Sequence, residues 1–260
     1  MLDENGFETL DAVRAFIGDR AAVLDPGSRY IRELRELVDA SRDPADLVER
    51  LDRGCRGRLH AGDDTWARMT PAEKVLSNLV TNETQLMRFE ASEVDLLHAE
   101  VLPWLRGTPG RVASIPCSHG LEPVSLAVEM LEAGLPFFHI AGFDIQRACI
   151  DTAMSARIPI AGLPRHVVAV VEPKVMNHLS FYELDVLTAP VPGRFDLIVC
   201  RNFLGYFTAP VARGLVEKLL SVLNVPGGLL VERFITQKHP EVFAGLGLAQ
   251  AGELPFFWRR

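Results

Sequence analysis

Residues 111–134 read RVASIPCSHGLEPVSLAVEMLEAG, a short apolar run followed by a glycine-bearing turn and an apolar helical segment. The run Val112–Ile115 has the length and composition of a buried strand, and Pro123–Ala133 has those of a helix. Gly120 in the turn lets a ligand approach backbone amides closely, and the following helix offers the positive end of its dipole. The stretch therefore predicts a strand, a ligand-accessible turn and a helix in succession.

The same alternation continues toward the C-terminus. Further strands are expected at Phe138–Phe143, Val167–Val171, Phe195–Cys200 and Gly228–Phe234, and further helices at Arg147–Ser155 and Ala209–Leu223. Pro226-Gly227-Gly228 indicates a turn before the last strand. This order predicts an α/β fold with an open, doubly wound parallel sheet, whose ligands bind at the carboxyl ends of the strands.

The residues ahead of this alternation are helical and strongly charged. Tyr30, Ile31 and Leu34 belong to an apolar series at three-to-four spacing. Arginines and acids alternate between residues 42 and 58, which favours a solvated face laced with i,i+4 ion pairs over a dedicated docking surface. Thr70-Pro71-Ala72-Glu73 combines a capping box with a proline at the first helical position. We predict a helical domain over residues 1–72 and a second domain over residues 73–260.

Composition limits the class of protein and the kind of partner. No apolar run reaches the roughly 18 residues of a membrane-spanning helix. A net charge of −7 offers little attraction to nucleic acid or anionic lipid. The cysteines, which are Cys55, Cys117, Cys149 and Cys200, form no C-x-x-C pair, and this argues against a disulfide framework and a thiolate zinc site. We expect a cytoplasmic protein without a bound metal, a nucleic-acid substrate or stable membrane insertion, and the sequence leaves its oligomeric state open.

One carboxylate is expected at a strand tip. Asp144 follows the second predicted strand, about 30 residues after the first strand begins, as in nucleotide-binding α/β folds. There it is placed to accept both hydroxyl groups of a ribose, and capping the helix that begins at Arg147 is a compatible alternative. No G-x-G-x-x-G follows the first strand and no P-loop motif occurs, which counts against dinucleotide and P-loop sites.

Three motifs, in this order, resemble signatures of the CheR-type chemotaxis receptor methyltransferases. Thr81–Arg88 (TNETQLMR) is similar to T-N-E-T-x-F-F-R, Cys117–Ser125 (CSHGLEPVS) to S-T-G-E-E-P-Y-S, and Asp196–Phe207 (DLIVCRNFLGYF) to D-x-I-x-C-R-N-V-x-I-Y-F. The resemblance covers roughly residues 81–234. It implies a seven-stranded, Rossmann-like methyltransferase sheet behind a small N-terminal helical domain, with S-adenosylmethionine as the cofactor and S-adenosylhomocysteine as its product.

The resemblance also implies roles for individual residues. The cofactor-binding set is Asn82, Thr84, Arg88, Pro116, Glu122, Asp144, Asp185, Val186, Arg201 and Asn202. Within it, Glu122 matches the acid that holds the methionine tail, Asp144 matches the ribose ligand, and Asp185-Val186 occupies the place of an adenine-binding pair. A methionine tail presents an ammonium to Glu122 and a carboxylate to backbone amides or Arg88, each through a charge-assisted hydrogen bond.

The acceptor implied by the resemblance is a glutamate of a receptor or signalling protein. A glutamate has a reference pKa of about 4.3 and is already anionic at neutral pH, so no general base is required. Catalysis then consists of holding the reacting atoms in line and excluding water. We predict that Arg88 orients the carboxylate and that Tyr206 walls the transfer site. The alternatives are a surface ion pair with Glu83 or Glu90 for Arg88, and core packing for Tyr206.

Departures from the family pattern concentrate on the acceptor side. Leu86-Met87 replaces two phenylalanines, and Val124 replaces a tyrosine. The chain is also shorter than the chemotaxis enzymes between residues 153 and 185, so that His166–Val171 and Val175–Tyr182 could form only a remnant hairpin. Three hypotheses stay open: a protein-glutamate O-methyltransferase, a related enzyme that methylates a small-molecule carboxylate or hydroxyl, and a non-catalytic cofactor-binding signalling module.

Overall fold

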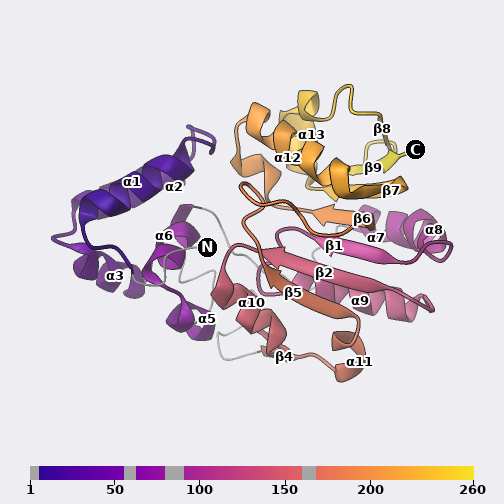
Figure 1. Cartoon of the computed structure of the whole chain (residues 1–260), viewed down its shortest axis with the longest axis horizontal. Helices are drawn as coiled ribbons and strands as arrows, with labels where there is room; N and C mark the ends of the chain where they lie inside the picture. Colours follow the sequence, from indigo (N-terminus) through magenta and orange to yellow (C-terminus); the bar gives the residue numbers. More distant parts are fainter. Residues whose placement is uncertain (1–5, 56–62, 80–90, 160–167) are drawn as a thin grey trace.

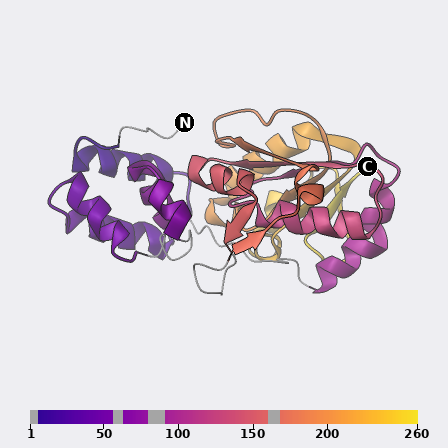
Figure 2. The same ribbon diagram turned by 90° about the horizontal axis from the view of Figure 1, so that it is seen from below.

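The computed structural model describes residues 6–55, 63–79, 91–159 and 168–260. Figure 1 shows a group of N-terminal helices beside a sheet flanked by helices, and Figure 2 shows the same two lobes turned by 90°. The N-terminal helices are α1 (Leu10–Ala21), α2 (Arg29–Asp39), α3 (Pro44–Asp52), α5 (Asp63–Arg68) and α6 (Pro71–Leu79). Among the described residues, none of the helices has both the length and the apolar character that crossing a membrane requires.

The predicted helical periodicity and capping box are confirmed in this lobe. Ile31 and Leu34 are buried on one face of α2. The backbone N–H of Glu73 donates to Thr70 Oγ1 at 3.2 Å, and that of Thr70 donates to Glu73 Oε2 at 2.8 Å, so α6 begins at Pro71 as predicted.

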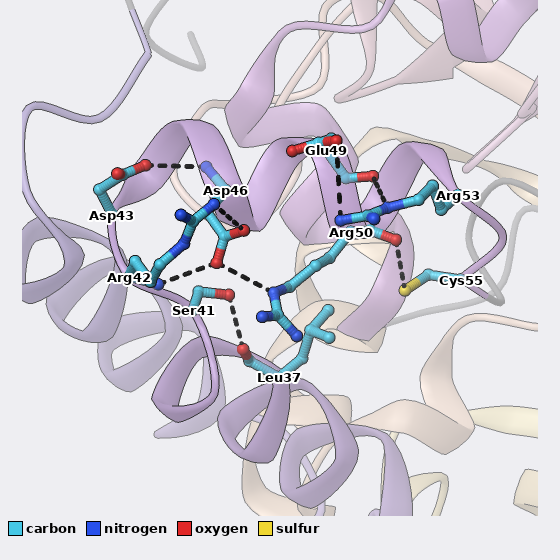
Figure 3. Close-up of polar contacts among 9 residues, drawn as sticks. All are labelled: Leu37, Ser41, Arg42, Asp43, Asp46, Glu49, Arg50, Arg53 and Cys55. Carbon is cyan, nitrogen blue, oxygen red and sulfur yellow. Dashed lines mark hydrogen bonds and ion pairs between the residues drawn. The ribbon is translucent and has the colours of Figure 1, made fainter.

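The predicted i,i+4 ion pairs are also present, but their centre is buried. Asp46 accepts hydrogen bonds from the backbone N–H of Arg42 at 2.9 Å and from the guanidinium groups of Arg42 at 3.1 Å and Arg50 at 3.0 Å (Figure 3). The hydrogen bonds from Arg42 and then from Arg50 hold the pKa of Asp46 well below its usual range. Asp43 caps the same helix by accepting from the backbone N–H of Asp46 at 2.8 Å. This network therefore fixes the start of α3.

The second lobe contains a seven-stranded sheet, which confirms the predicted α/β class. The strands are β1 (Arg111–Ser114), β2 (His139–Asp144), β5 (Leu179–Glu183), β6 (Phe195–Cys200), β7 (Leu223–Val231), β8 (Leu248–Gln250) and β9 (Phe256–Arg259). Their order is β5-β2-β1-β6-β7-β9-β8, with β9 antiparallel to β7 and β8, and the other pairs parallel. The chain runs outward from β1 through β2 to β5 and then crosses to β6, so a topological switch point lies between β1 and β6.

Helices cover both faces of this sheet. They are α7 (Ala91–Leu96), the π-helix η1 (Leu97–Val101), α8 (Leu102–Leu105), α9 (Leu121–Glu132), α10 (Arg147–Met154), α11 (Pro173–Met176), η2 (Leu204–Tyr206), α12 (Ala209–Val222), α13 (Arg233–Lys238) and η3 (Pro240–Val242). All six residues of β6 are buried, and they alternate between the two apolar clusters, with Leu197 and Val199 in one and Ile198 and Cys200 in the other. The second of these clusters continues into the helical lobe, so the two lobes share a core.

Three element predictions were wrong. Val168–Val170 (β4) pairs with Arg157–Pro159 (β3) in a separate two-stranded sheet, whereas the proposed hairpin partner Val175–Tyr182 contributes to α11 and to the edge strand β5. The turn predicted at Pro226-Gly227-Gly228 lies inside β7, where the register with β6 shifts. The strand predicted to reach Phe234 ends at residue 231, because α13 follows.

Candidate functional site

A pocket lies at the carboxyl ends of β1, β2 and β5, against the helical lobe. It encloses about 580 Å³ of empty space, part of which is open to solvent. The charged residues that line it are Arg20, Asp144 and Asp185. The apolar lining residues are Val23, Leu24, Leu76, Ile115, Pro116, Phe143, Ile145, Leu184, Val186, Leu187, Phe203 and Phe207. Such a lining suits a flat, largely apolar ring system that carries a few hydrogen-bonding groups.

Asp144, the last residue of β2, supplies a buried carboxylate to this pocket. Its Oδ2 accepts from the backbone N–H of Ser118 and its Oδ1 from that of Gln146, each at 2.9 Å. Burial raises the pKa of Asp144 to about 6, although these backbone hydrogen bonds act in the opposite direction. A carboxylate has about four acceptor positions, so about two remain for a ligand.

Asp144 does not cap α10, which was the alternative role considered for it. Gln146 is the N-cap residue, and its side chain makes no capping hydrogen bond. The backbone N–H of Ala148 donates instead to Glu73 Oε1 at 3.0 Å. One backbone N–H in the first turn of α10 is therefore satisfied by a side chain of α6 in the helical lobe.

The turn after β1 requires a glycine. Gly120 has a φ of +85°, and a Cβ there would lie 2.7 Å from the Cβ of Ala153. The neighbouring His119 is fully buried, and burial lowers its pKa to about 4, which keeps its ring neutral near pH 7. Its Nδ1 lies 3.2 Å from Ser118 Oγ, and its Nε2 lies 3.7 Å from Cys149 Sγ. His119 is therefore part of the packing beneath the turn.

Glu122, in the first turn of α9, belongs to a buried cluster of charges. Ser114 Oγ donates to its Oε1 at 2.9 Å, and Arg201 Nη1 lies 3.7 Å from its Oε2. Arg201 also forms an ion pair of 3.0 Å with Glu93, whose side chain is 1% exposed. Among the described residues, nothing donates a hydrogen bond to Glu122 Oε2. A buried carboxylate oxygen in this state has capacity for a cationic donor.

Asp185, which follows β5, faces both its own loop and the helical lobe. Its Oδ1 accepts from the backbone N–H of Leu187 at 3.0 Å, and its Oδ2 accepts from Arg20 at 3.0 Å. Lys218 holds the loop from behind, because its Nζ donates to the carbonyls of Val186 at 2.7 Å and Leu187 at 3.0 Å. The strand end and these four hydrogen bonds fix the position of the Asp185-Val186 pair at the pocket.

The loop after β6 is pinned to the helical lobe. Asn202 is exposed and has a positive φ of 53°. The carbonyl of Tyr206 accepts from the backbone N–H of Asp25 at 2.8 Å, and the next residue, Phe207, forms a β-bridge with Leu24. Tyr206 is half-buried, so its backbone joins the two lobes.

The predicted site residues fall into three groups. Pro116, Asp144, Asp185 and Val186 line one pocket, whereas Glu122, Arg201, Asn202 and Tyr206 lie in neighbouring segments outside its lining. Asn82, Thr84 and Arg88 lie outside the described residues.

Two charged residues near the site were not identified from the sequence. Arg20 lines the pocket from α1, and Glu93 pairs with Arg201 from α7. Their partners are 165 and 108 residues away along the chain, so no local motif connects them. In the part of the chain that the structure describes, no group of three or more His, Cys, Asp or Glu residues could hold a metal ion.

Comparison with known proteins places these features in a family context. The family model described as "CheR methyltransferase, SAM binding domain" matches residues 82–234, which is more than half of the chain. Two proteins named probable biofilm formation methyltransferase WspC are each 29% identical: the Pseudomonas putida protein over 86% of this chain and 59% of its own length, and the Pseudomonas aeruginosa protein over 89% and 61%. Chemotaxis protein methyltransferase 1 of P. aeruginosa is 30% identical over 61% of this chain and 67% of its own length. The chain thus spans about three-fifths of the length of the two WspC relatives.

Proposed function

This chain belongs to the CheR methyltransferase family, and we propose that it binds S-adenosylmethionine in the pocket beside Asp144 and transfers the methyl group to a protein glutamate. The observation that carries the proposal is the pair of carboxylates, Asp144 and Asp185, at the ends of adjacent parallel strands in an otherwise apolar pocket. An adenosyl group needs this combination, because its ring is flat and apolar and its hydroxyl and amino groups donate hydrogen bonds.

The adenosyl half would be held by side chains. The hydrogen bonds that Asp144 accepts from Ser118 and Gln146 leave acceptor capacity on its carboxylate for the ribose hydroxyls. Asp185 has one further lone pair on each oxygen to accept from the adenine amino group. Pro116 and Val186 supply apolar surface to the ring. These contacts orient the base and the ribose and exclude water from them.

The methionine half would be held by Glu122. Its Oε2, which accepts no hydrogen bond from a described residue, is suited to an ammonium group. Arg201, fixed by Glu93, lies close enough to orient the Glu122 carboxylate, so in this proposal Arg201 acts mainly through Glu122. Asn82, Thr84, Arg88 and Asn202 remain predicted contacts of the same cofactor.

The chemistry proposed here requires positioning rather than proton transfer. The bound cofactor supplies an electrophilic methyl group on a positively charged sulfur. The acceptor glutamate is already ionised at neutral pH, so the protein has to orient it and keep water out. Neutral His119 and the buried thiol of Cys200, whose pKa is raised first by burial and then by Glu232 and Glu122, are poorly suited to act as base or nucleophile. Arg88 is proposed to orient the acceptor, and Tyr206 to wall the transfer site.

A protein acceptor is preferred to a small molecule. The replacements at Leu86, Met87 and Val124 favour a changed acceptor, but Leu86 and Met87 lie outside the described residues. Val124 is buried in α9 and does not line the pocket. It lines a groove formed with α11 and β4 instead. Relatives of this chain are named for chemotaxis and biofilm formation, which supports a receptor or signalling protein as the methylated partner.

The decisive experiment uses the full chain, cofactor tritiated in the methyl group, and the soluble and membrane fractions of the host. The proposal expects label on a protein, released as volatile methanol by alkali, and no label with Asp144→Ala. Label that resists alkali would refute carboxyl methylation while retaining a methyltransferase. Binding of S-adenosylhomocysteine without any transfer would favour the non-catalytic module.

A further inference from the structure

The helical lobe contributes a wall to the pocket. Arg20, Val23, Leu24 and Leu76 line the pocket, and all four precede the region matched by the family model. Arg20, near the C-terminal end of α1, forms an ion pair of 3.0 Å with Asp185, and their side chains are 23% and 11% exposed. The pair joins the two lobes at the wall where the adenine is expected.

This wall is held on two sides. On one side, residues 23–25 run antiparallel to residues 206–208, with hydrogen bonds from the N–H of Thr208 to the carbonyl of Val23 at 3.2 Å and from the N–H of Asp25 to the carbonyl of Tyr206 at 2.8 Å. On the other side, Gln146 Nε2 donates to Ser77 Oγ at 2.6 Å. The backbone around Arg20 is therefore fixed independently of the Arg20 side chain.

From this arrangement we infer that Arg20 is a positioning residue for Asp185 and that it sets the preference of the pocket for an amino-purine. The inference rests on the proposed binding of an adenosyl cofactor. Asp185 lies in a mostly apolar wall, where an isolated carboxylate is costly. Arg20 balances that charge and occupies one lone pair of Oδ2, while Leu187 occupies one of Oδ1.

The lone pairs of Asp185 that Arg20 and Leu187 leave unoccupied determine which base the pocket prefers. A carboxylate can only accept hydrogen bonds, so the pocket favours a base that presents a hydrogen-bond donor to Asp185. The exocyclic amine of adenine is a donor, whereas the 6-oxo group of hypoxanthine is an acceptor. Without Arg20, the carboxylate of Asp185 would be free to turn toward solvent, since it is already partly exposed. Both the affinity for adenine and the discrimination against the 6-oxo base should then fall.

The test measures calorimetric affinities of the full chain for S-adenosylhomocysteine and for its inosine analogue. Arg20→Ala should weaken binding of S-adenosylhomocysteine roughly tenfold, the size of a lost charge-assisted hydrogen bond, and should reduce the ratio between the two ligands. Arg20→Lys should restore part of both. Adding Arg20→Ala to Asp185→Ala should cause no further loss, because the pair acts as one unit.

Lys238→Gln is the matched control. Lys238 pairs with Asp25 and so also links the two lobes, but neither residue lines the pocket. In the Lys238→Gln variant, the affinity for S-adenosylhomocysteine and the ratio of affinities for the two ligands should stay unchanged. Equal loss in Lys238→Gln and Arg20→Ala, or a ligand ratio that Arg20→Ala leaves unmoved, would overturn the inference and leave Arg20 as a lobe-docking contact. A wild-type chain that binds neither ligand would overturn the proposed function itself, and with it the inference.

Discussion

The affinity for S-adenosylhomocysteine should depend on pH through Asp144. Its folded-state pKa is about 6, raised by burial from an ordinary value of 3.8. The ionised carboxylate is the form that accepts the ribose hydroxyls, so binding should strengthen as pH rises through 6. At pH 5 the carboxyl group of Asp144 is ionised in only about a tenth of the molecules, so the apparent dissociation constant should be roughly tenfold higher than at pH 8.

Titration calorimetry at pH 5, 6, 7 and 8 measures this dependence, and Asp144→Asn provides the control. The variant should bind more weakly at pH 8 and should lose the dependence on pH. His119 does not interfere, because its pKa of about 4 keeps it neutral across this range. The thiol of Cys117 does not interfere either, since burial raises its pKa well above the ordinary value. An affinity that is constant from pH 5 to 8, or an equal dependence in Asp144→Asn, would refute the role of Asp144.

The raised pKa of Asp144 also makes the stability of the ligand-free protein depend on pH. Because the folded pKa lies above the unfolded one, the folded protein holds the proton more tightly, and stability falls as pH rises from about 3.8 to about 6. A shift of this size corresponds to about 3 kcal/mol. Saturating S-adenosylhomocysteine should offset part of this loss, which thermal melting at pH 5 and pH 8 can measure.

Three further substitutions test the site. Gly120→Ala should lower the free energy of unfolding by about 2 kcal/mol or more in urea titrations, because the φ of Gly120 is +85° and a Cβ has no room there. The control Gly214→Ala, in α12 with open space around it, should raise the free energy of unfolding by about 0.5–1 kcal/mol, and equal effects of the two substitutions would refute the steric argument. Glu122→Gln should weaken S-adenosylmethionine binding at least roughly tenfold by calorimetry, and retained affinity would remove its role toward the ammonium. Glu93→Gln should cost about 3–5 kcal/mol of stability, since it leaves Arg201 with less compensation in a buried cluster; a loss below about 1 kcal/mol in urea would contradict this.

The sequence predicted those helices and strands whose signal lies within a few neighbouring residues. Phe195–Cys200 is buried on both faces, so an unbroken apolar run was a sufficient signal for β6. The capping box at Thr70 and Glu73 likewise acts within one turn. Short strands gave weaker signals. β8 and β9 were not predicted individually, because three or four residues hold too little periodicity to distinguish a strand from a loop.

The candidate site was predictable where its residues follow strands and unpredictable where they come from another lobe. Asp144 follows a strand that the sequence predicted, so topology places it at the carboxyl edge of the sheet. Asp185 was predicted from the family resemblance, because residues 175–182 had been interpreted as part of a remnant hairpin rather than as the strand β5. Arg20 and Glu73 reach the site through tertiary packing across long stretches of chain. Such contacts leave no periodicity or spacing in the sequence, and only the fold reveals them.

The two carboxylates of the pocket are balanced in different ways, and this difference indicates where ligand binding contributes most. Asp185 has Arg20 as a counter-ion within the protein. Among the described residues, Asp144 forms no ion pair, and the charge that acts on it most is the negative Glu73. Among the described residues, backbone N–H groups are what offsets the cost of ionising Asp144, and a ligand can offset it further. Ribose hydroxyls that donate to Asp144 would relieve that cost, whereas an adenine amine at Asp185 meets a carboxylate whose charge is already satisfied. The ribose contact should therefore contribute more to affinity, and the adenine contact more to the choice of base.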